Sequence, residues 1–238
     1  MNRALAVSAS GMAAEQANLD IVAANLANAD VAGFKAATAT FATLGGGSLG
    51  TALTGTHAIF TQGKLMRTGG PFDVAIQGRG FFVVERDGTR AYTRAGSFER
   101  AADGRLRNAD GWRLTGVRIP SDASNVTVAA DGRVSVRTPH GVRSVGRIAL
   151  ATFDADEELR TIGSALFAPT AASGRPRALV AGGSLGPTIA FGALEKSNVS
   201  VVESMMAILT AQRAYEANAK GVQAADEMLR IANNLHRA

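Results

Sequence analysis

Apolar residues recur at intervals of seven near both ends of the chain. The first series is Leu5, Met12, Leu19 and Leu26. The second series is Val201, Ile208, Tyr215, Val222 and Leu229. This spacing places side chains along one side of an α-helix, so we expect helices over residues 3–29 and over about residues 200–236. Because neither helix buries its apolar stripe alone, the stripes predict that the helices pack together and form an assembly seam with other subunits.

The start of the second helix carries a capping signal. Ser200 and Glu203 have the spacing of a capping box, in which the serine hydroxyl accepts a hydrogen bond from the backbone N–H three residues later. Asn198 lies just upstream and is a competing cap. Gly221 lies inside the helix and costs about 1 kcal/mol relative to alanine. Packing along the seam must therefore offset this cost.

The sequence between the two helices has a different pattern. Residues 36–70 contain glycine-rich and threonine-rich stretches without a sustained period, which predicts a linker or extended arm. From Phe72 onward, short β-branched and aromatic runs alternate with Asp-Gly pairs, which favour tight turns between strands. The runs are 80–86, 89–94, 125–129, 133–137 and 145–153, and the Asp-Gly pairs begin at Asp87, Asp103, Asp110 and Asp131.

These patterns together predict an α+β fold. Long N- and C-terminal helices pair as a coiled-coil-like domain, and an all-β domain is inserted between them. The expected divisions are the N-terminal helix of an inner assembly domain over residues 1–35, the arm over 36–70, the β domain over 71–192, and the C-terminal helix of the assembly domain over 193–238.

The amino-acid composition offers few residues that could act in catalysis or bind a metal. Its 238 residues include no cysteine and three histidines, so thiol nucleophiles, disulfides and zinc–thiolate sites are excluded and few general bases are available. Residues 45–50 match the G-x-G-x-x-G pattern of a dinucleotide-binding turn, but the residues that follow make a poor helix. We therefore expect a protein that is not an enzyme, with no catalytic residue, no cofactor and no metal.

Positive charge is concentrated in one part of the chain. Residues 64–118 hold eleven basic and six acidic residues, an excess equal to the net charge of +5 of the whole chain. Because acidic residues alternate with the arginines, this pattern is typical of a solvated face of a β domain. A β domain that binds a polyanion, such as nucleic acid or a cell-wall polymer, is the alternative function, and it predicts binding that weakens with salt.

Short motifs near both ends and in the middle of the chain are characteristic of one family. They are Ala24–Asn28 with Asn25 and Asn28, Gly33-Phe34-Lys35, Gly80-Phe81-Phe82, Tyr92-Thr93-Arg94, Ser197-Asn198-Val199, and Gln212–Asn218 with Arg213 and Glu216. In this order they resemble the bacterial flagellar basal-body rod and hook protein family, and the C-terminal motif is most like that of the distal rod member. The sequence differs from the usual pattern of the distal rod member at Ala24, at Val31 and in the segment 41–62, which is shorter here. The proximal-rod paralogue is therefore the alternative.

The resemblance implies a structural subunit that polymerises helically into a hollow drive shaft and transmits torque to the hook. Its implied partners are further copies, other rod and hook subunits, and flagellar ring and export components, with no nucleic acid. It also implies a place in the periplasm-spanning basal body and export without a cleaved signal peptide. Ser8, Ser10 and Gly11 interrupt the apolar residues near the start, which agrees with this expectation. No apolar run has the length of a membrane span.

Overall fold

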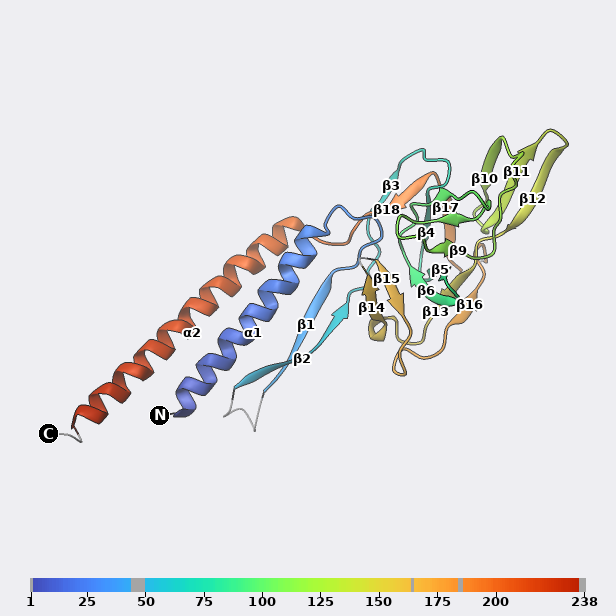
Figure 1. The fold of residues 1–238 in the computed structure, drawn as a ribbon. Helices are drawn as coiled ribbons and strands as arrows, with labels where there is room; N and C mark the ends of the chain where they lie inside the picture. Colours follow the sequence, from blue (N-terminus) through green and yellow to red (C-terminus); the bar gives the residue numbers. More distant parts are fainter. Residues whose placement is uncertain (1, 44–49, 164, 184–185, 236–238) are drawn as a thin grey trace. The chain divides into compact units, whose positions relative to one another are not determined.

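The computed structural model describes residues 2–43, 50–163, 165–183 and 186–235. Within them it has an α+β fold, with one helix on each side of a β-rich region in the sequence (Figure 1). Helix α1 is Asn2–Ala27 and helix α2 is Val201–Leu235, which confirms the two expected helices. Neither of them has the length and apolar content that crossing a bilayer requires. Residues 44–49, which hold most of the glycine pattern at 45–50, lie outside the described residues.

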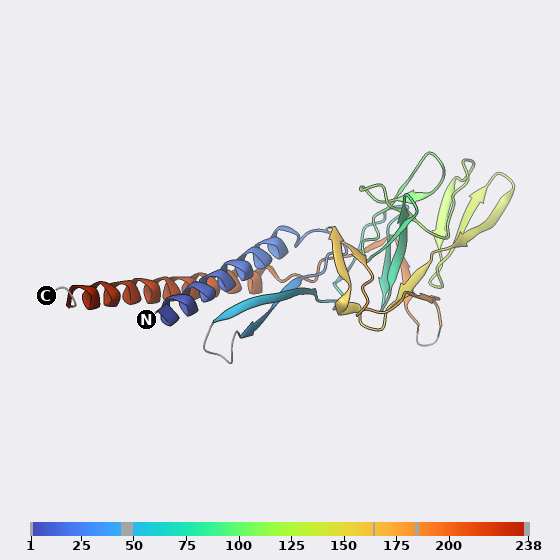
Figure 2. The ribbon, with the colours of Figure 1, turned by 60° about the horizontal axis from the view of Figure 1, so that its bottom comes forward.

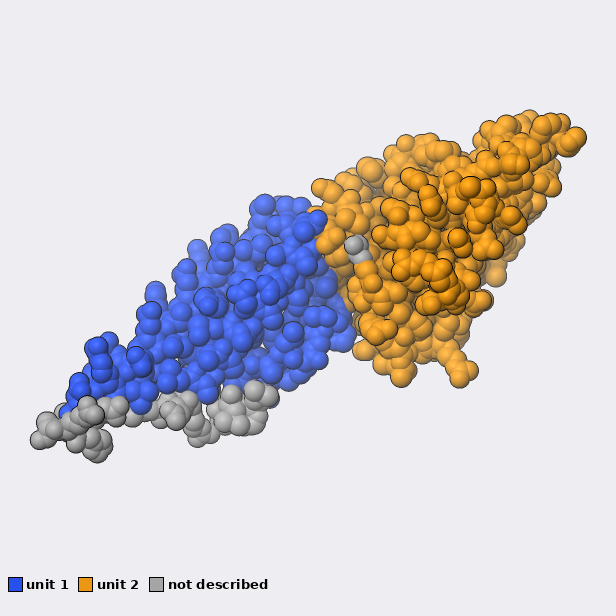
Figure 3. Space-filling model, viewed as in Figure 1, with its two compact units in different colours: residues 1–27, 37–57, 199–238 blue, residues 28–36, 58–198 orange. Residues whose placement is uncertain are grey.

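The chain divides into two compact units (Figure 3). Unit 1 contains residues 1–27, 37–57 and 199–238, and unit 2 contains residues 28–36 and 58–198. Each unit is therefore assembled from segments that are far apart in the sequence.

In unit 1, α1 and α2 lie side by side (Figure 1 and Figure 2). Small residues allow close approach between them. A Cβ atom built on Gly11 would lie 2.8 Å from Asn218 Nδ2, and one built on Gly221 would lie 3.0 Å from Ser8 Oγ. Gly221 weakens an isolated helix, so its position at this close approach gives a physical reason for a glycine there.

Two strands of unit 1 lie within the segment expected to form a linker or extended arm. Strands β1 (Ala37–Thr43) and β2 (Thr51–Ala58) pair as a two-stranded sheet, and their many threonines favour extended backbone. Thr51 N donates a hydrogen bond to Ser10 Oγ of α1 at 3.1 Å, which holds the start of β2 against the helix. The four expected divisions, at residues 1–35, 36–70, 71–192 and 193–238, stay a prediction.

Unit 2 is built from short antiparallel strands. These are β3 (Leu65–Arg67), β4 (Val74–Gln77), β5 (Phe81–Arg86), β6 (Thr89–Thr93), β7 (Glu99–Arg100), β8 (Leu106–Arg107), β9 (Arg113–Leu114), β10 (Asn125–Val128), β11 (Arg133–Thr138), β12 (Gly141–Arg147), β13 (Leu150–Thr152), β14 (Arg160–Gly163), β15 (Leu166–Ala168), β16 (Arg177–Leu179), β17 (Thr188–Phe191) and β18 (Ala193–Glu195). The largest sheet has the order β14-β15-β6-β5-β9-β8-β7, with β13 paired to β5 and to β16. Strands β10, β11 and β12 form a second sheet, β17 pairs with β4, and β18 pairs with β3.

The Asp-Gly pairs do form turns, and the clearest one joins β5 to β6. Asp87 and Gly88 have φ values of 52° and 78°, as a two-residue type I′ turn requires, and Arg86 pairs directly with Thr89. The run 145–153 is divided between two strands. Strand β12 pairs with β11, whereas β13 pairs with β5 and β16, so the chain changes sheets between Arg147 and Leu150.

The core of unit 2 has two apolar clusters. The larger one includes Trp112, the single tryptophan of the chain, which is 5% exposed. The smaller one is aromatic, and the rings of Tyr92 and Phe153 meet edge to face with centroids 4.8 Å apart. Trp112 fluorescence therefore reports on the folding of unit 2.

Candidate functional site

A buried ionic cluster lies where the Gly33-Phe34-Lys35 motif enters unit 2. Lys35 Nζ lies 2.6 Å from Glu195 Oε1, and both side chains are completely buried. Lys35 Nζ also donates to Thr61 O at 2.6 Å, and Gly63 N donates to Glu195 Oε1 at 2.9 Å. The Lys35–Glu195 pair therefore ties the start of unit 2 to its last strand.

Arg94 adds a second buried cation to the same cluster. Its Nε lies 3.7 Å from Glu195 Oε2, and its Nη2 donates to Gly78 O at 2.7 Å. Asp156, which begins the short 3₁₀ helix η2 (Asp156–Glu158), is nearly buried and accepts a hydrogen bond from the exposed Arg79 at 3.0 Å. We call Lys35, Arg94 and Glu195 the ionic junction.

Burial sets the electrostatics of the ionic junction. It lowers the pKa of the Lys35 ammonium from its ordinary value of 10.5, while the charge and hydrogen bond of Glu195 oppose this shift. Burial likewise lowers the pKa of Arg94, and the carboxylates of Glu195 and Asp156 oppose it. Two buried cations thus depend chiefly on Glu195, and removal of that carboxylate would leave both without their nearest counter-charge.

Gly33 allows the chain to reach the ionic junction. Its φ is +70°, a value that residues with a Cβ rarely adopt. A Cβ atom at this position would lie 2.2 Å from the backbone nitrogen of Ala95, so the segment passes directly against the strand end that carries Arg94. Gly33 N donates to Glu195 O at 2.7 Å, and Phe34 is buried beside it.

Asn198 joins three segments of unit 2 through its side chain. Its Nδ2 donates to Ile59 O at 2.7 Å and to Thr61 Oγ1 at 2.9 Å, and its Oδ1 accepts from Ala36 N at 2.7 Å. Ser200 caps α2 instead, because Glu203 N donates to Ser200 Oγ at 3.3 Å. Asn198 is thus used as a clamp between segments rather than as a helix cap.

Asn25 makes an equivalent clamp in unit 1. Its Nδ2 donates to Ala37 O at 2.7 Å, and its Oδ1 accepts from Ala37 N at 2.8 Å. The amide therefore satisfies both backbone groups of the first residue of β1. Asn28 forms a turn in which its carbonyl accepts from Val31 N at 3.1 Å.

Comparison with known proteins identifies the family. Three family models match this chain: flagella basal body rod protein over residues 5–35, the D1 domain of flagellar hook protein FlgE/F/G over residues 75–136, and the C-terminal region of flagellar basal body rod FlgEFG protein over residues 191–235. The chain is 36% identical to the flagellar basal-body rod protein FlgG of Agrobacterium fabrum, with 96% of this chain and 97% of that protein covered. The chain belongs to the flagellar basal-body rod protein family. This is a family of structural components, not of enzymes.

Other relatives extend this result. FlgG of Borreliella burgdorferi is 38% identical, and the match covers the whole of both chains. The flagellar basal-body rod protein FlgF of Caulobacter vibrioides is 34% identical over 98% of this chain. The matched regions of the three rod-family models contain Lys35, Arg94 and Glu195 respectively, so each of them contributes one member of the ionic junction.

The remaining rod-family motif residues lie on α2. Gln212, Arg213 and Glu216 are exposed in the single chain. Of the residues assigned to the seam, Val201 and Tyr215 are 43% and 39% exposed. The others, Leu5, Met12, Leu19, Leu26, Ile208, Val222 and Leu229, are half-buried. Their role between subunits stays a prediction.

Sequence patterns did not reveal the ionic junction. The charge pattern of residues 64–118 predicts a solvated β face that includes Arg94, and this prediction is wrong for Arg94 because the residue is 4% exposed. Glu195 stands alone in the sequence, and its partner Lys35 is 160 residues away. The one available signal was that Arg94 and Lys35 both end family motifs.

The Asn198 clamp gives a prediction for stability. Asn198→Ala removes three hydrogen bonds, two to residues 59–61 and one to Ala36, and should lower the free energy of unfolding of unit 2 by about 1.5–4.5 kcal/mol, since each net hydrogen bond contributes about 0.5–1.5 kcal/mol. Urea unfolding followed by Trp112 fluorescence measures this change. Lys196→Ala, at an exposed neighbouring position, is the matched control. Equal stability of the two variants would show that the clamp contributes nothing.

Proposed function

We propose that this chain is a structural subunit of the distal flagellar rod, and that copies polymerise helically into a hollow shaft that transmits torque to the hook. Relatives named FlgG, at 31–38% identity over nearly the whole chain, support the assignment to the rod. The partners in this proposal are further copies, other rod and hook subunits, and ring and export components. The subunit would reach the periplasm-spanning rod without a cleaved signal peptide.

An exposed apolar face of α2 is the observation that carries this proposal. Val202, Met205, Met206 and Leu209 are 68%, 53%, 64% and 57% exposed. Their spacing of three and four residues places them on one side of the helix. Ser204 and Ala211, which are buried, lie on the opposite side by the same spacing. Helix α2 therefore has a second apolar face that α1 leaves uncovered.

Coverage of this face by helices of other copies would stabilise an assembly. Burying an exposed methionine or leucine side chain contributes about 1.5–3 kcal/mol, so four of them supply a substantial part of a subunit contact. The coiled-coil-like pairing of α1 with α2, and the seam formed by the two heptad series, belong to the same proposal. The side-by-side arrangement of the two helices supports it.

A charge placed on the exposed face of α2 tests this proposal. Met206→Asp should leave the single chain folded, because Met206 is exposed there, but should abolish polymerisation, because a buried carboxylate without a partner is costly. Sedimentation and electron microscopy of the purified full chain measure polymer formation, and motility of cells that rely on the variant measures function.

Gln223→Asp is the matched control. It adds the same charge at an exposed position of α2 that is already polar and lies beyond residues 202–209, and it should polymerise normally. Normal polymers and normal motility with Met206→Asp would show that the exposed face is not a subunit contact.

A further inference from the structure

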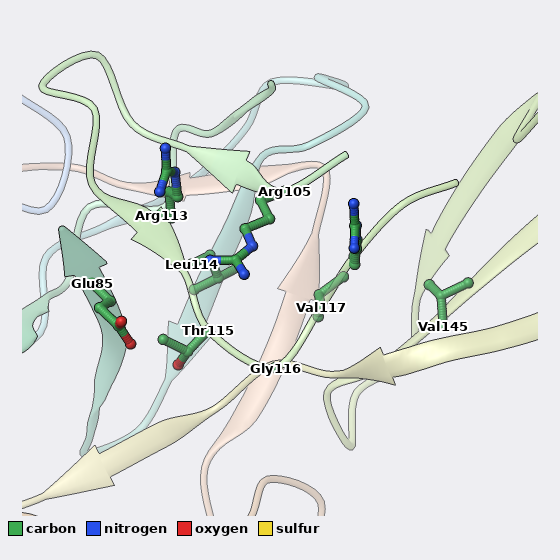
Figure 4. A pocket seen from close by; sticks show the side chains of 9 residues that line it. Glu85, Arg105, Arg113, Leu114, Thr115, Gly116, Val117 and Val145 are labelled. Carbon is green, nitrogen blue, oxygen red and sulfur yellow. The ribbon is translucent and has the colours of Figure 1, made fainter. Parts of the chain in front are cut away.

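Unit 2 has an arginine-lined pocket that contains no residue of the ionic junction and none of α1 or α2. A cavity of about 370 Å³ is lined by Arg105, Arg113 and Arg118, with Glu85 at its edge. In Figure 4 the Arg105 and Arg113 side chains lie beside each other, and Glu85 and Thr115 lie below them. A second cavity of about 460 Å³ shares Arg118. It adds Arg100 and Arg143, and we call the two cavities together the arginine pocket.

The arginine pocket has an excess of positive charge. Five guanidinium groups line it, against the carboxylates of Glu85 and Asp103. Asp103 Oδ2 lies 4.0 Å from Arg105 Nε and 3.9 Å from Arg113 Nε, so one carboxylate is shared by two guanidiniums at long distance. A hydrogen bond from Arg105 N, followed by the charges of the nearby arginines, lowers the pKa of Asp103.

The guanidiniums of the arginine pocket keep unused hydrogen-bond donors. Among the described residues, no hydrogen bond joins the Arg105 or Arg113 guanidinium to another group, and their side chains are 50% and 48% exposed. A guanidinium presents N–H groups in a planar fork that matches a carboxylate. The pocket is therefore suited to one or more incoming carboxylates.

The same unit carries an exposed acidic turn that matches this chemistry. Residues 154–158, which include η2, hold four acidic side chains, and we call them the acidic turn. Asp154 pairs with Arg177, and Asp156 pairs with Arg79. Glu157 and Glu158 are exposed, and within the described part of the chain neither makes an ion pair. Thr170 Oγ1 donates to Glu158 O at 2.8 Å, which fixes the backbone of the turn.

A recess beside the acidic turn provides a second observation. A cavity of about 590 Å³ is lined by the whole turn together with Ile59, Phe60, Thr61 and Arg79. Asp156 lines this recess, and its Oδ1 is buried without a hydrogen-bond partner among the described residues. A buried carboxylate oxygen of this kind favours an incoming N–H donor. The recess is therefore suited to a side chain such as arginine.

We propose that the acidic turn of one copy docks into the arginine pocket of a neighbouring copy. This inference rests on the proposed function, because it requires copies to assemble. The two surfaces share no residue, and strands β12 and β14, which adjoin the pocket and the turn, lie at opposite ends of unit 2 (Figure 1 and Figure 2). Two different complementary surfaces on one chain form a head-to-tail contact, which continues as a filament when the rotation between copies does not close a ring.

A charge reversal and its compensation test the proposal. Arg105→Glu with Arg113→Glu, or Glu157→Arg with Glu158→Arg, should each raise the concentration of full chain needed for polymerisation by at least about tenfold, because like charges then face each other. The variant with all four substitutions should regain most of the lost polymerisation, since each reversed turn meets a reversed pocket. Light scattering measures polymerisation, and Trp112 fluorescence verifies that each variant is folded.

The outcomes separate this inference from the proposed function. If the unaltered chain forms no polymer, the proposed function fails. If the unaltered chain polymerises and both reversals polymerise equally well, the docking proposal is overturned and the proposed function stands. If only the arginine reversal has an effect, the pocket binds an anion other than the acidic turn. If the fourfold variant regains nothing, the two surfaces do not contact each other. Either result overturns the docking proposal.

Cross-linking provides a second, independent measurement. Because the chain has no cysteine, a copy with Glu157→Cys can be mixed with a copy carrying Arg113→Cys. Polymers of the mixture should give a disulfide-linked dimer of the two variants under oxidation. Glu99→Cys, at an exposed acidic position outside the turn, replaces Glu157→Cys in the control and should give none. Equal dimer yields from both mixtures would count against the contact.

Discussion

Replacement of Glu195 by glutamine is expected to lower the free energy of unfolding of unit 2 by about 3–5 kcal/mol, the usual cost of removing one partner from a buried ion pair. Glutamine keeps the shape and the Oε1 atom that accepts from Lys35 and Gly63. It removes the charge, so Lys35 and Arg94 stay buried without their shared counter-charge. Urea unfolding followed by Trp112 fluorescence measures the effect.

The pH dependence of the Glu195→Gln variant identifies the cause. Without Glu195, burial lowers the pKa of Lys35 further below 10.5, its ordinary value. The unfolded chain then binds more protons than the folded chain between the lowered pKa and 10.5, so the stability of the variant should rise with pH across this window. Glu99→Gln, at an exposed position, is the control and should change stability little. A loss of stability equal to that of the control would show that the ionic junction does not stabilise unit 2.

Replacement of Gly33 by alanine is the second large effect that we expect. A side chain at φ +70° costs about 1–2 kcal/mol, and the added Cβ would meet the backbone of Arg94 and Ala95, where a clash costs about 1–3 kcal/mol more. The combined loss of about 2–5 kcal/mol should appear in unfolding followed by Trp112 fluorescence. Stability falls because the segment before Lys35 must move away from Arg94 and Ala95, which follow β6.

Gly69→Ala separates the two contributions to this loss. Gly69 has a φ of +69°, but a Cβ atom there would meet nothing within 4 Å, so only the backbone cost applies. We expect Gly69→Ala to lose about 1–2 kcal/mol and Gly33→Ala to lose clearly more. If both variants lose the same free energy of unfolding, close packing against Arg94 and Ala95 contributes nothing to stability.

The features that sequence predicts here are those that depend on neighbouring residues. The heptad series predicts both helices, and Asp87-Gly88 predicts the β5–β6 turn, because spacing and backbone preference act over a few positions. The order of the strands and the burial of Arg94 depend on contacts between distant segments. A charged residue in a basic stretch looks solvated until its partner is known, and Glu195 has no local pattern that marks it as that partner.

The ionic junction sets an order of events when unit 2 folds. Lys35 and Glu195 are separated by 160 residues, and β3 and β4, the first strands after residue 60, pair with β18 and β17, the last two. Closing such long loops makes folding slow, because chain entropy is lost before the contacts form. A chain that emerges gradually from its N-terminal end, whether from a ribosome or from a narrow passage, cannot complete unit 2 until residue 195 is free. Unit 2 therefore stays incomplete until nearly the whole chain has emerged.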